Sequence, residues 1–423
     1  MTPDTRHTHL KLTEHILENG LRVIIHEDHA IPIVAVDVCY HVGSKNEHPE
    51  RTGFAHLFEH LMFDGSRNVK RGEFDRYITR AGGWNNAYTA WDKTNYYEVL
   101  PSNQIELALW LESDRMMDLD ITDVSLETQR SVVKEERRWR VDNQPYGTSE
   151  EQIFNRAYRH HPYRWPVIGS MDHLDRASLS DVREFFAAYY VPNNAVLVLV
   201  GDVNPDEGVE LARKYFGEIP RSGNDIQRPA IVEPPQQMEE RFEIMDNIQL
   251  PALFMAFRIP EEGHPDFFPL ALASDILTNG DSSRLYRRLV YEQKIAQDVS
   301  SIVYNLEEPG LLWISATSMD STPAGLLEEE VLKSIADIQS EGVTDEELQK
   351  VKNQTESSAT LGKQRVDQKA DMIAHYAVLR NDPGLVNTDI QNYYNVTTDD
   401  IRRVVRTYCV REGRTVAHYI PKS

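Results

Sequence analysis

Runs of apolar residues, some alternating with polar ones, predict strands in the first half of the chain. Around residues 16–43 the runs LENGLRVII and IPIVAVDVCYHV are separated by the polar stretch HEDHA. The Asn19-Gly20 pair is typical of a turn between antiparallel strands. WNNAYTAWDKTNYYEVL, which follows Gly82-Gly83, is rich in aromatic residues and favours two more strands. The uninterrupted run NNAVLVLVGDV predicts a short, fully buried strand.

Helical periodicity fills the stretches between these strands. Apolar residues that recur every three or four positions predict five helices. Four of them cover Thr52 to Met62, Arg71 to Arg80, Gln104 to Met117 and Ser125 to about Val141, and the fifth ends near Tyr190. Strands, then helices, then a closing strand predict an α+β domain with a largely antiparallel sheet and helices packed on one face.

A proline-rich stretch predicts the boundary between two domains. Residues 220–240, PRSGNDIQRPAIVEPPQQMEE, hold four prolines and few periodic apolar positions, as linkers do. The predicted organisation is a first domain at 1–222, a linker at 223–240 and a second domain at 241–423.

The second half repeats the pattern of the first and favours an internal duplication. A strand, LPALFMAFRI, precedes a turn and helix in GHPDFFPLALASDILTNGDSSRL. Laying His48-Pro49 on His264-Pro265 pairs His56 with Leu272, Glu59 with Asp275 and His60 with Ile276. The second domain is therefore expected to be homologous to the first without its polar helix, although two ordinary α+β domains would share as much.

Composition and charge narrow the functional classes. Of the 423 residues, 40% are hydrophobic and 26% charged, as in a globular protein of about two domains. The formal net charge of −22 argues against nucleic-acid binding and against docking on anionic membranes. No apolar run approaches the roughly 18 residues of a membrane span. Residues 1–15 hold no signal-peptide core, so the expected location is cytoplasmic, or periplasmic if a signal peptide has been removed.

The segment His56-Leu57-Phe58-Glu59-His60 carries the most distinctive chemistry. Histidines four apart on a helix lie one turn above the other and can reach one metal ion. Glu59 lies beside them, where a general base would take a proton from a water activated by the metal. The pattern H-x-x-E-H is the zinc helix H-E-x-x-H read backwards. With 15 histidines and 67 acidic residues in the chain, roughly 0.1 such patterns are expected by chance.

A catalytic zinc site needs a third protein ligand, and a carboxylate is a common one. Glu135 and Glu136 of LETQRSVVKEERRW point about 100° apart on a helix, so only one can face inward. Glu136 lies three or four residues from Val132, Val133 and Trp139, which modestly favours it. The pattern alone leaves open that both glutamates are solvated.

Several motifs together resemble one family. HLFEHLMF, GGWNNAYTAWDKTNYYEVLP and QRSVVKEERRWRVDNQP follow one another in the first half, and HPYRWPVIG, YYVPNNAVLVLVGDV and GDSSRLYRRL come later. In this order and spacing they resemble the pitrilysin/insulinase-type zinc metallopeptidases, the inverzincins. Within that group the chain looks like the short two-domain branch of bacterial and mitochondrial processing peptidases. The resemblance covers most of the chain and implies a zinc endopeptidase or oligopeptidase that hydrolyses extended peptides.

The resemblance also implies roles for individual residues. The family's zinc glutamate lies about 76 residues after the second histidine, as Glu136 does after His60. His56, His60 and Glu136 would then hold Zn²⁺, with Glu59 as the general base.

In the family, peptide substrates add as a strand to a sheet edge near the metal. The matching stretch here is Trp84 to Thr89, and Asn86, Ala87 and Tyr88 are the expected substrate-binding residues. The alternative for the aromatic residues of this stretch is ordinary strand packing.

Two positions depart from the family pattern. Gln129 stands where some members carry a second glutamate, seven residues before the zinc ligand. Active members hold substrate with an Arg and, seven residues on, a Tyr; Val290 and Gln297 stand there, although a shift of two residues would use Arg288.

These departures lead to two functional hypotheses. The first is a catalytic subunit of a heterodimer, with a homologous partner that supplies the Arg/Tyr clamp. The alternative is a non-cleaving scaffold or binding subunit derived from the same family.

Overall fold

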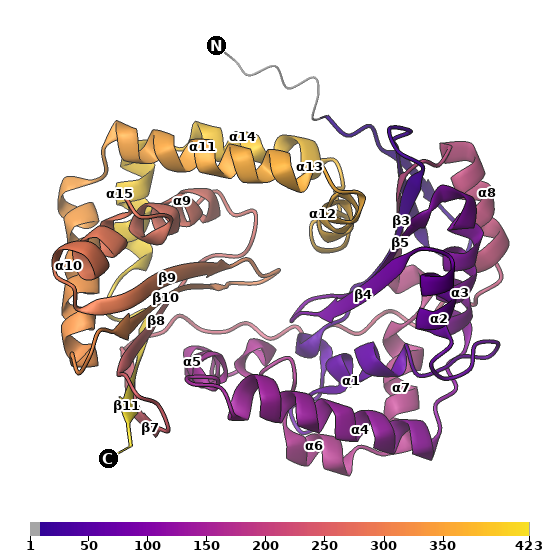
Figure 1. Ribbon diagram of the computed structural model, residues 1–423, viewed down its shortest axis with the longest axis horizontal. Helices are drawn as coiled ribbons and strands as arrows, with labels where there is room; N and C mark the ends of the chain where they lie inside the picture. The colour runs from indigo at the N-terminus through magenta and orange to yellow at the C-terminus, as the bar shows by residue number, and fades with distance from the viewer. Residues whose placement is uncertain (1–8, 423) are drawn as a thin grey trace. The chain divides into compact units, whose positions relative to one another are not determined.

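A computed structural model describes residues 9–422, and the chain within that range divides into two compact units. Unit 1 contains residues up to 137 together with 165–230 and 359–388. Unit 2 contains 138–164, 231–358 and the residues from 389 onward. Each unit is built around one sheet (Figure 1).

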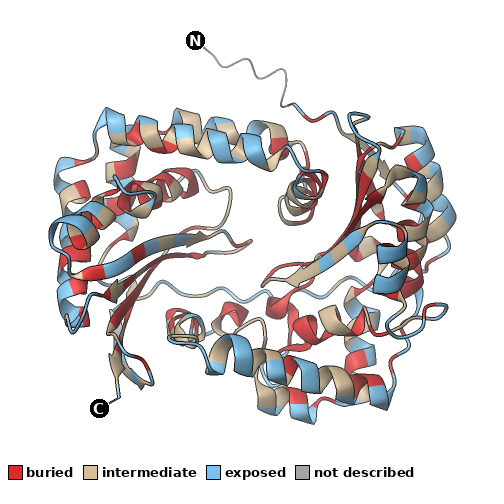
Figure 2. Ribbon diagram, viewed as in Figure 1, coloured by how far each residue is buried: buried red, intermediate tan, exposed pale blue. Residues whose placement is uncertain are grey.

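The sheet of unit 1 has six strands in the order β1-β2-β6-β3-β5-β4. All neighbouring pairs are antiparallel except β2 and β6, which run parallel. Buried residues follow β3 and β5 along most of their length (Figure 2). The strands are β1 Thr13–Ile16, β2 Arg22–Glu27, β3 Ile33–Tyr40, β4 Trp84–Thr89, β5 Thr94–Pro101 and β6 Ala195–Gly201.

Helices from the first half of the chain cover one face of this sheet. Their apolar residues form one core with alternate residues of the strands, such as Val34, Val36 and Val38 of β3. This alternation is what the apolar pattern predicts for a sheet with a packed face. The helices are α1 Phe54–Leu61, α2 Phe74–Arg80, α3 Ile105–Met117, α4 Asp123–Arg137, α6 Met171–Arg176, α7 Leu179–Tyr189 and α8 Pro205–Phe216.

The sheet of unit 2 has five strands in the order β7-β11-β8-β10-β9. The only parallel pair of this sheet joins its first and last strands in the chain, β7 and β11. Its strands are β7 Glu240–Asp246, β8 Ala252–Arg258, β9 Ala296–Tyr304, β10 Leu311–Ser318 and β11 Arg414–Pro421. Helices of this half include α9 Phe267–Thr278, α10 Ala324–Glu341, α11 Asp345–Gly362, α14 Ile390–Asn395 and α15 Thr398–Tyr408. Helix α13, Leu385–Thr388, belongs to unit 1.

The two sheets share one strand topology. Strands β2, β3, β4, β5 and β6 neighbour one another as β7, β8, β9, β10 and β11 do, with the same parallel pair. Helix α1 follows β3 and helix α9 follows β8. The architecture is thus α+β with two homologous halves, each a largely antiparallel sheet whose own helices pack on one face.

The two halves exchange helical segments, a feature that the sequence pattern does not show. Helix α12, Val366–Leu379, comes from the second half but packs on the other face of the first sheet. Ile373 and Ala374 of α12 share a core with Ala35 of β3 and Val198 of β6. Figure 1 shows α12 on the opposite side of β3 and β5 from α3. This exchange makes the compact units discontinuous, in contrast to the predicted contiguous domains 1–222 and 241–423.

Helix α5, Ser149–Ala157, is the reciprocal segment, since it comes from the first half and belongs to unit 2. Phe154 of α5 packs its ring on Tyr304 of β9, with 4.9 Å between ring centroids. Glu150 of α5 accepts a hydrogen bond from the Tyr304 hydroxyl at 2.8 Å.

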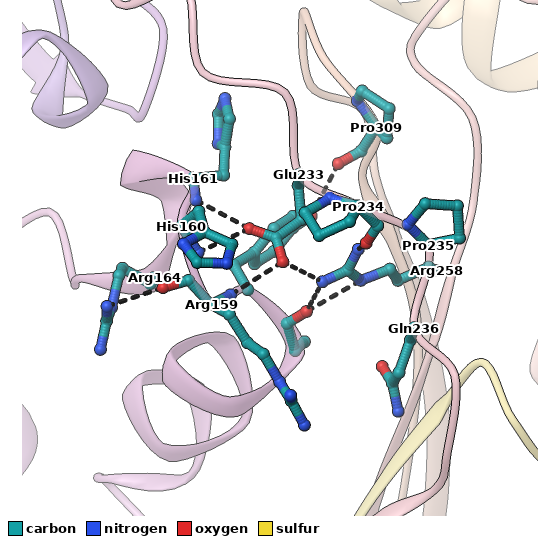
Figure 3. Close-up of polar contacts among 12 residues, drawn as sticks. Arg159, His160, His161, Arg164, Glu233, Pro234, Pro235, Gln236, Arg258 and Pro309 are labelled. Carbon is teal, nitrogen blue, oxygen red and sulfur yellow. Dashed lines mark hydrogen bonds and ion pairs between the residues drawn. The ribbon is translucent and has the colours of Figure 1, made fainter.

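The second part of the proline-rich linker is fixed to unit 2 through Glu233 (Figure 3). Its carboxylate accepts hydrogen bonds from the backbone N–H groups of Arg159, His160 and His161 at 2.7–2.9 Å. The Arg258 guanidinium of β8 lies 2.8 Å from it. Burial alone would raise the pKa of Glu233, but these donors outweigh it and lower the pKa to about 2. Residues from 231 onward are therefore anchored, whereas 223–230 belong to unit 1.

Two expectations concern membranes and the start of the chain. No helix within the described residues is long and apolar enough to cross a membrane. The expectation that no signal peptide is present rests in part on residues 1–8, which lie outside the described residues.

Candidate metal centre

The residue that precedes helix α1 is a glycine, Gly53. Gly53 has φ +93°, and a Cβ there would lie 2.8 Å from the carbonyl oxygen of Ile168. No side chain of the N-cap residue caps this helix. The carboxylate of Glu47 does so from outside, accepting the N–H of Gly53 at 2.9 Å and of Ala55 at 2.8 Å. A carboxylate at this end satisfies the unpaired first-turn amides and fixes the start of the helix.

Burial raises the pKa of Glu47 to about 8, and the backbone N–H donors of α1 oppose that rise. Glu47 is 5% exposed. Its contacts with the first turn were not predicted, because no local cap motif precedes the helix.

His56 and His60 lie on one face of α1, as their spacing predicts. Their ring centroids are 4.9 Å apart and the rings are nearly perpendicular. The opposite face, with Leu57, Phe58 and Leu61, is buried in the core of unit 1. The apolar face therefore orients the helix, and the histidines face outward from the core as a consequence.

Glu136 on α4 meets this histidine pair. Its Oε2 atom lies 3.1 Å from Nε2 of His60 and 3.6 Å from Nε2 of His56. Among residues 9–422, these three form the one group of His, Cys, Asp and Glu side chains arranged to hold a metal ion, with ligand atoms within 4.8 Å of one another. Glu135 is exposed and does not join the group.

The apolar stripe is a weak reason for choosing Glu136. Val133 is buried, but Val132 is 42% exposed and Trp139 67% exposed. The helix face of Glu136 is set by the contact of α4 with α1 and not by a continuous apolar stripe.

The donor set and its spacing fit zinc. Two imidazole nitrogens and a carboxylate oxygen are a set that catalytic zinc sites use, with a fourth position open. Ligand atoms about 2.1 Å from a tetrahedral ion are about 3.4 Å from one another. The two measured nitrogen–oxygen distances, 3.1 and 3.6 Å, bracket that value.

Glu59 lies next to this group and receives a hydrogen bond from strand β4. The Thr89 hydroxyl donates to its Oε2 atom at 2.6 Å. This bond holds one oxygen of the Glu59 carboxylate in place. Thr89 ends the predicted stretch Trp84 to Thr89 but was not singled out in it. Its alternation with Asn85 and Ala87 along the strand is the only local signal.

A cavity of about 700 Å³ adjoins Glu59 and His60 within unit 1. It is lined by residues of α1, α2, β4 and α4, most of them polar: Glu59, His60, Phe63, Asp64, Arg71, Gly72, Asp75, Thr79, Asn85, Asn86, Ala87 and Gln129. A cleft with this many hydrogen-bonding groups beside a metal group is suited to a polar, extended ligand.

Strand β4 lies at the edge of the first sheet and at the rim of this cavity. Ala87 lines the cavity and packs on the core of unit 1. Asn86 also lines the cavity and lies opposite Tyr97 of the neighbouring strand. Tyr88 differs from the expectation, because its hydroxyl donates to Asp371 of α12 on the other face of the sheet. Strand alternation explains this, since neighbouring side chains point to opposite faces.

Gln129, the first departure from the family pattern, lines the same cavity. Its amide donates to Oδ1 of Asp64 at 2.8 Å. The Arg71 guanidinium lies 2.9 Å from the same oxygen. The amide thus belongs to a polar network beside the metal group and does not contribute a charge to it.

The clamp positions of the second half hold no Arg and Tyr. Val290 is partly buried against the core of unit 2, and Gln297 is exposed on β9. Arg288, the nearby alternative, is engaged by α10, donating to Ser334 at 2.8 Å and pairing with Asp337 at 3.1 Å.

Comparisons with known proteins agree with this fold. Residues 22–170 match the family model described as insulinase (peptidase family M16), and residues 176–355 match the peptidase M16 inactive domain. A relative from Helicobacter pylori named zinc protease PqqE is 31% identical over 396 residues, 93% of this chain and 89% of the relative. The mitochondrial-processing peptidase subunit beta of Lentinula edodes is 26% identical, over 93% of this chain and 86% of its own length.

Solved structures show the same architecture. The crystal structure of a protease from Helicobacter pylori has a TM-score of 0.94 and 30% identity, covering 97% of this chain and all of that one. Pitrilysin shares the fold at 16% identity, with a TM-score of 0.78 over 98% of this chain and 45% of pitrilysin.

The fold and these matches define a two-domain protein of the M16 peptidase type. The chain belongs to the insulinase family of peptidases, M16, in its short two-domain form.

Proposed function

We propose that this chain is a zinc-dependent endopeptidase or oligopeptidase that hydrolyses extended peptides. The observation that carries the proposal is the convergence of His56, His60 and Glu136 beside Glu59 at the rim of a polar cavity. Relatives that share most of the chain are named zinc proteases, which supports the same metal and reaction.

Each residue has a distinct part in the reaction. His56, His60 and Glu136 would hold zinc, which supplies a Lewis acid that activates a water molecule and polarises the scissile carbonyl. Glu59 takes a proton from the attacking water and passes it to the leaving amine. Thr89 holds one oxygen of Glu59 and so fixes the direction of the other.

The peptide adds to the free edge of β4, through main-chain hydrogen bonds. Asn86 and Ala87 supply the strand positions at the cavity rim, and backbone recognition suits peptides of varied sequence. Tyr88 contributes its backbone, since its side chain is engaged with α12.

We further propose that the chain acts as the catalytic subunit of a heterodimer. Val290 and Gln297 occupy the positions of the family's substrate clamp, and Arg288 is held by α10. A homologous partner that carries Arg and Tyr would complete the site. The name of the Lentinula relative, a subunit beta, is consistent with such pairing in that protein.

The alternative is a non-cleaving scaffold or binding subunit. The missing clamp favours it, as does the match of residues 176–355 to a domain described as inactive. The complete set of His56, Glu59, His60 and Glu136 favours the peptidase.

Replacement of Glu59 separates these functions. Glu59→Gln removes the base but keeps its shape, so peptide cleavage should fall by about 10³-fold or more while about one zinc per chain remains bound. Asp275→Asn, at the aligned position of α9, is the matched control and should keep full activity. Cleavage of fluorogenic peptides is measured for the chain alone and with a homologous partner.

Three results would count against the proposal. Activity that survives Glu59→Gln contradicts the mechanism. No cleavage by the wild-type chain under any pairing supports the scaffold. Full activity of the chain alone contradicts the heterodimer.

A further inference from the structure

The face of β4 that points away from the metal group is held by a polar cluster with no part in the proposed reaction. Asn85 and Thr89 turn toward the metal side, where Asn85 donates to Asp75 of α2 at 2.9 Å and Thr89 donates to Glu59. Tyr88 turns the other way, toward Asp371 of α12. The strand is therefore held from both sides.

Asp371 collects donors from both strands of the β4–β5 hairpin. Its Oδ1 atom accepts hydrogen bonds from the Tyr88 hydroxyl, from Lys93 at 3.1 Å and from Asn95 at 3.3 Å. Tyr88 belongs to β4, Lys93 to the turn and Asn95 to β5. One carboxylate oxygen thus ties the whole hairpin to α12.

The cluster extends into the sheet. The Asn95 amide also donates to Asp37 of β3 at 2.9 Å, and both residues are fully buried. Lys93 has a side chain that is only 8% exposed, and Asp371 is its ion-pair partner. Loss of Asp371 would leave a nearly buried ammonium group without that carboxylate, which is costly in a protein interior.

Strand β4 depends on such anchoring because it is an edge strand. Its backbone pairs with β5 alone, over six residues. A short edge strand that is held only by its ladder is among the first elements to open. A peptide that adds to β4 needs it already ordered, or part of the binding energy is lost in ordering it.

We infer that Asp371 is a positioning residue, which through Tyr88 and Lys93 holds β4 in the conformation that receives the peptide. The expected effect of Asp371 on cleavage rests on the proposed function, whereas its effect on the order of β4 does not. Helix α12, which comes from the second half of the chain, would thus help to form the peptide-binding site of the first half. Zinc content should not depend on Asp371, because the metal ligands lie on α1 and α4.

The chain offers a matched control on the same helix. Lys369 of α12, with a side chain 5% exposed, pairs with Asp28 after β2 at 2.6 Å. Each of the two substitutions removes the carboxylate that pairs with a nearly buried lysine between α12 and the sheet. Asp28→Asn does so for Lys369, and Asp371→Asn does so for Lys93. They differ in that only Asp371 contacts the β4–β5 hairpin.

The first test measures amide hydrogen exchange of residues 84–89, which needs no activity. Asp371→Asn should speed exchange there by about tenfold, and Asp28→Asn should leave it unchanged. Tyr88→Phe removes one hydroxyl and should give a smaller rise in the same residues, with little risk to folding. Unchanged exchange in Asp371→Asn, or an equal rise in Asp28→Asn, overturns the inference.

The second test separates binding from chemistry. Asp371→Asn should raise KM for a peptide by about five- to tenfold, with kcat within about twofold and zinc content unchanged. The Kd of a fluorescent peptide for Glu59→Gln, with and without Asp371→Asn, should shift by the same factor. A fall in kcat at unchanged KM overturns the inference. The two proposals can fail separately. If Asp371→Asn speeds exchange in β4 but neither the wild-type chain nor any variant cleaves peptide, the anchoring of β4 by Asp371 stands and only the proposed peptidase function is refuted.

Discussion

The two halves of this chain share a five-strand topology, but the matching helices α1 and α9 differ in polarity. On α1 the positions that face away from the core are His56, Glu59 and His60. On α9 the aligned positions are Leu272, Asp275 and Ile276. Leu272 and Ile276 are buried in the core of unit 2. A shared scaffold thus supports a metal group in one half and a packed core in the other.

Helices α1 and α9 differ in how much of their surface is accessible. His60 and Glu59 line a cavity, while α9 is buried along most of its length. Burial raises the pKa of Asp275, and a hydrogen bond from Asn279 opposes that rise. A helix that must admit substrate needs one polar, accessible face, whereas a helix with only a structural role can bury every apolar side chain.

The largest effect is expected when α1 is given the residues of α9. His56→Leu with His60→Ile should abolish zinc binding and lower peptide cleavage by at least about 10⁴-fold. The fold should persist, because α9 shows that the topology accepts these side chains. Metal analysis, circular dichroism and a peptide assay measure the three outcomes.

A surface histidine of the same unit provides the control for that experiment. His48→Leu should change neither zinc content nor activity. If the double variant keeps one zinc per chain, the metal group assigned here is wrong.

The next effect separates the two adjacent glutamates of α4. Glu136→Gln should weaken zinc binding by about 100-fold or more, because the amide loses the charge that a zinc ligand supplies. Glu135→Gln should leave zinc affinity within about twofold, since Glu135 is exposed and outside the group. Competition with a zinc-sensitive dye measures both affinities, and equal losses in the two variants would contradict the assignment.

A gain of activity is expected when the second half receives the clamp that it lacks. Val290→Arg with Gln297→Tyr should raise kcat/KM of the isolated chain about tenfold, because the pair would position the peptide without a partner. The same pair of changes combined with Glu59→Gln should remain inactive. A peptide assay on the purified monomeric chain decides this, and a lack of gain would place the clamp elsewhere.

The smallest effect concerns a carboxylate of unit 2 that has no catalytic role. Glu233→Gln should lower the free energy of unfolding by about 2–3 kcal/mol at neutral pH and leave zinc content unchanged. The folded-state pKa of about 2 lies below the ordinary value of 4.5, so this stabilisation is present above pH 4.5 and is lost as the pH falls toward 2. Denaturant titrations of both proteins across that range measure it, and equal stabilities at neutral pH would contradict the expectation.

Much of the fold was predicted because its signals are local. The predicted helix Thr52 to Met62 is observed as Phe54–Leu61, and Gln104 to Met117 as Ile105–Met117. The predicted buried strand is β6, all seven of whose residues are buried. These elements carry their own periodicity and breakers, so a short window of sequence specifies them.

The sequence missed features that depend on distant segments. The contact of Thr89 with Glu59 joins residues 30 apart, and that of Tyr88 with Asp371 joins residues 283 apart. The exchange of α12 and α5 between halves belongs to the same class. The local sequence pattern of α12 and α5 does not predict which of the two sheets each helix packs on.

By itself the sequence determined most strands and helices of the first half and the placement of His56, Glu59 and His60 on one helix face, because periodicity is local and helical geometry fixes which side chains share a face. For the third ligand the pattern only modestly favoured Glu136 over Glu135 and the family resemblance selected it; its contact with α1 comes from the tertiary structure, in which Glu136 lies 3.1 Å from His60. Only the tertiary structure decided that Tyr88 anchors β4 while Thr89 holds Glu59. The physical reason is that periodicity orients a side chain relative to its own element, whereas its partner is selected by the packing of elements far apart in the chain.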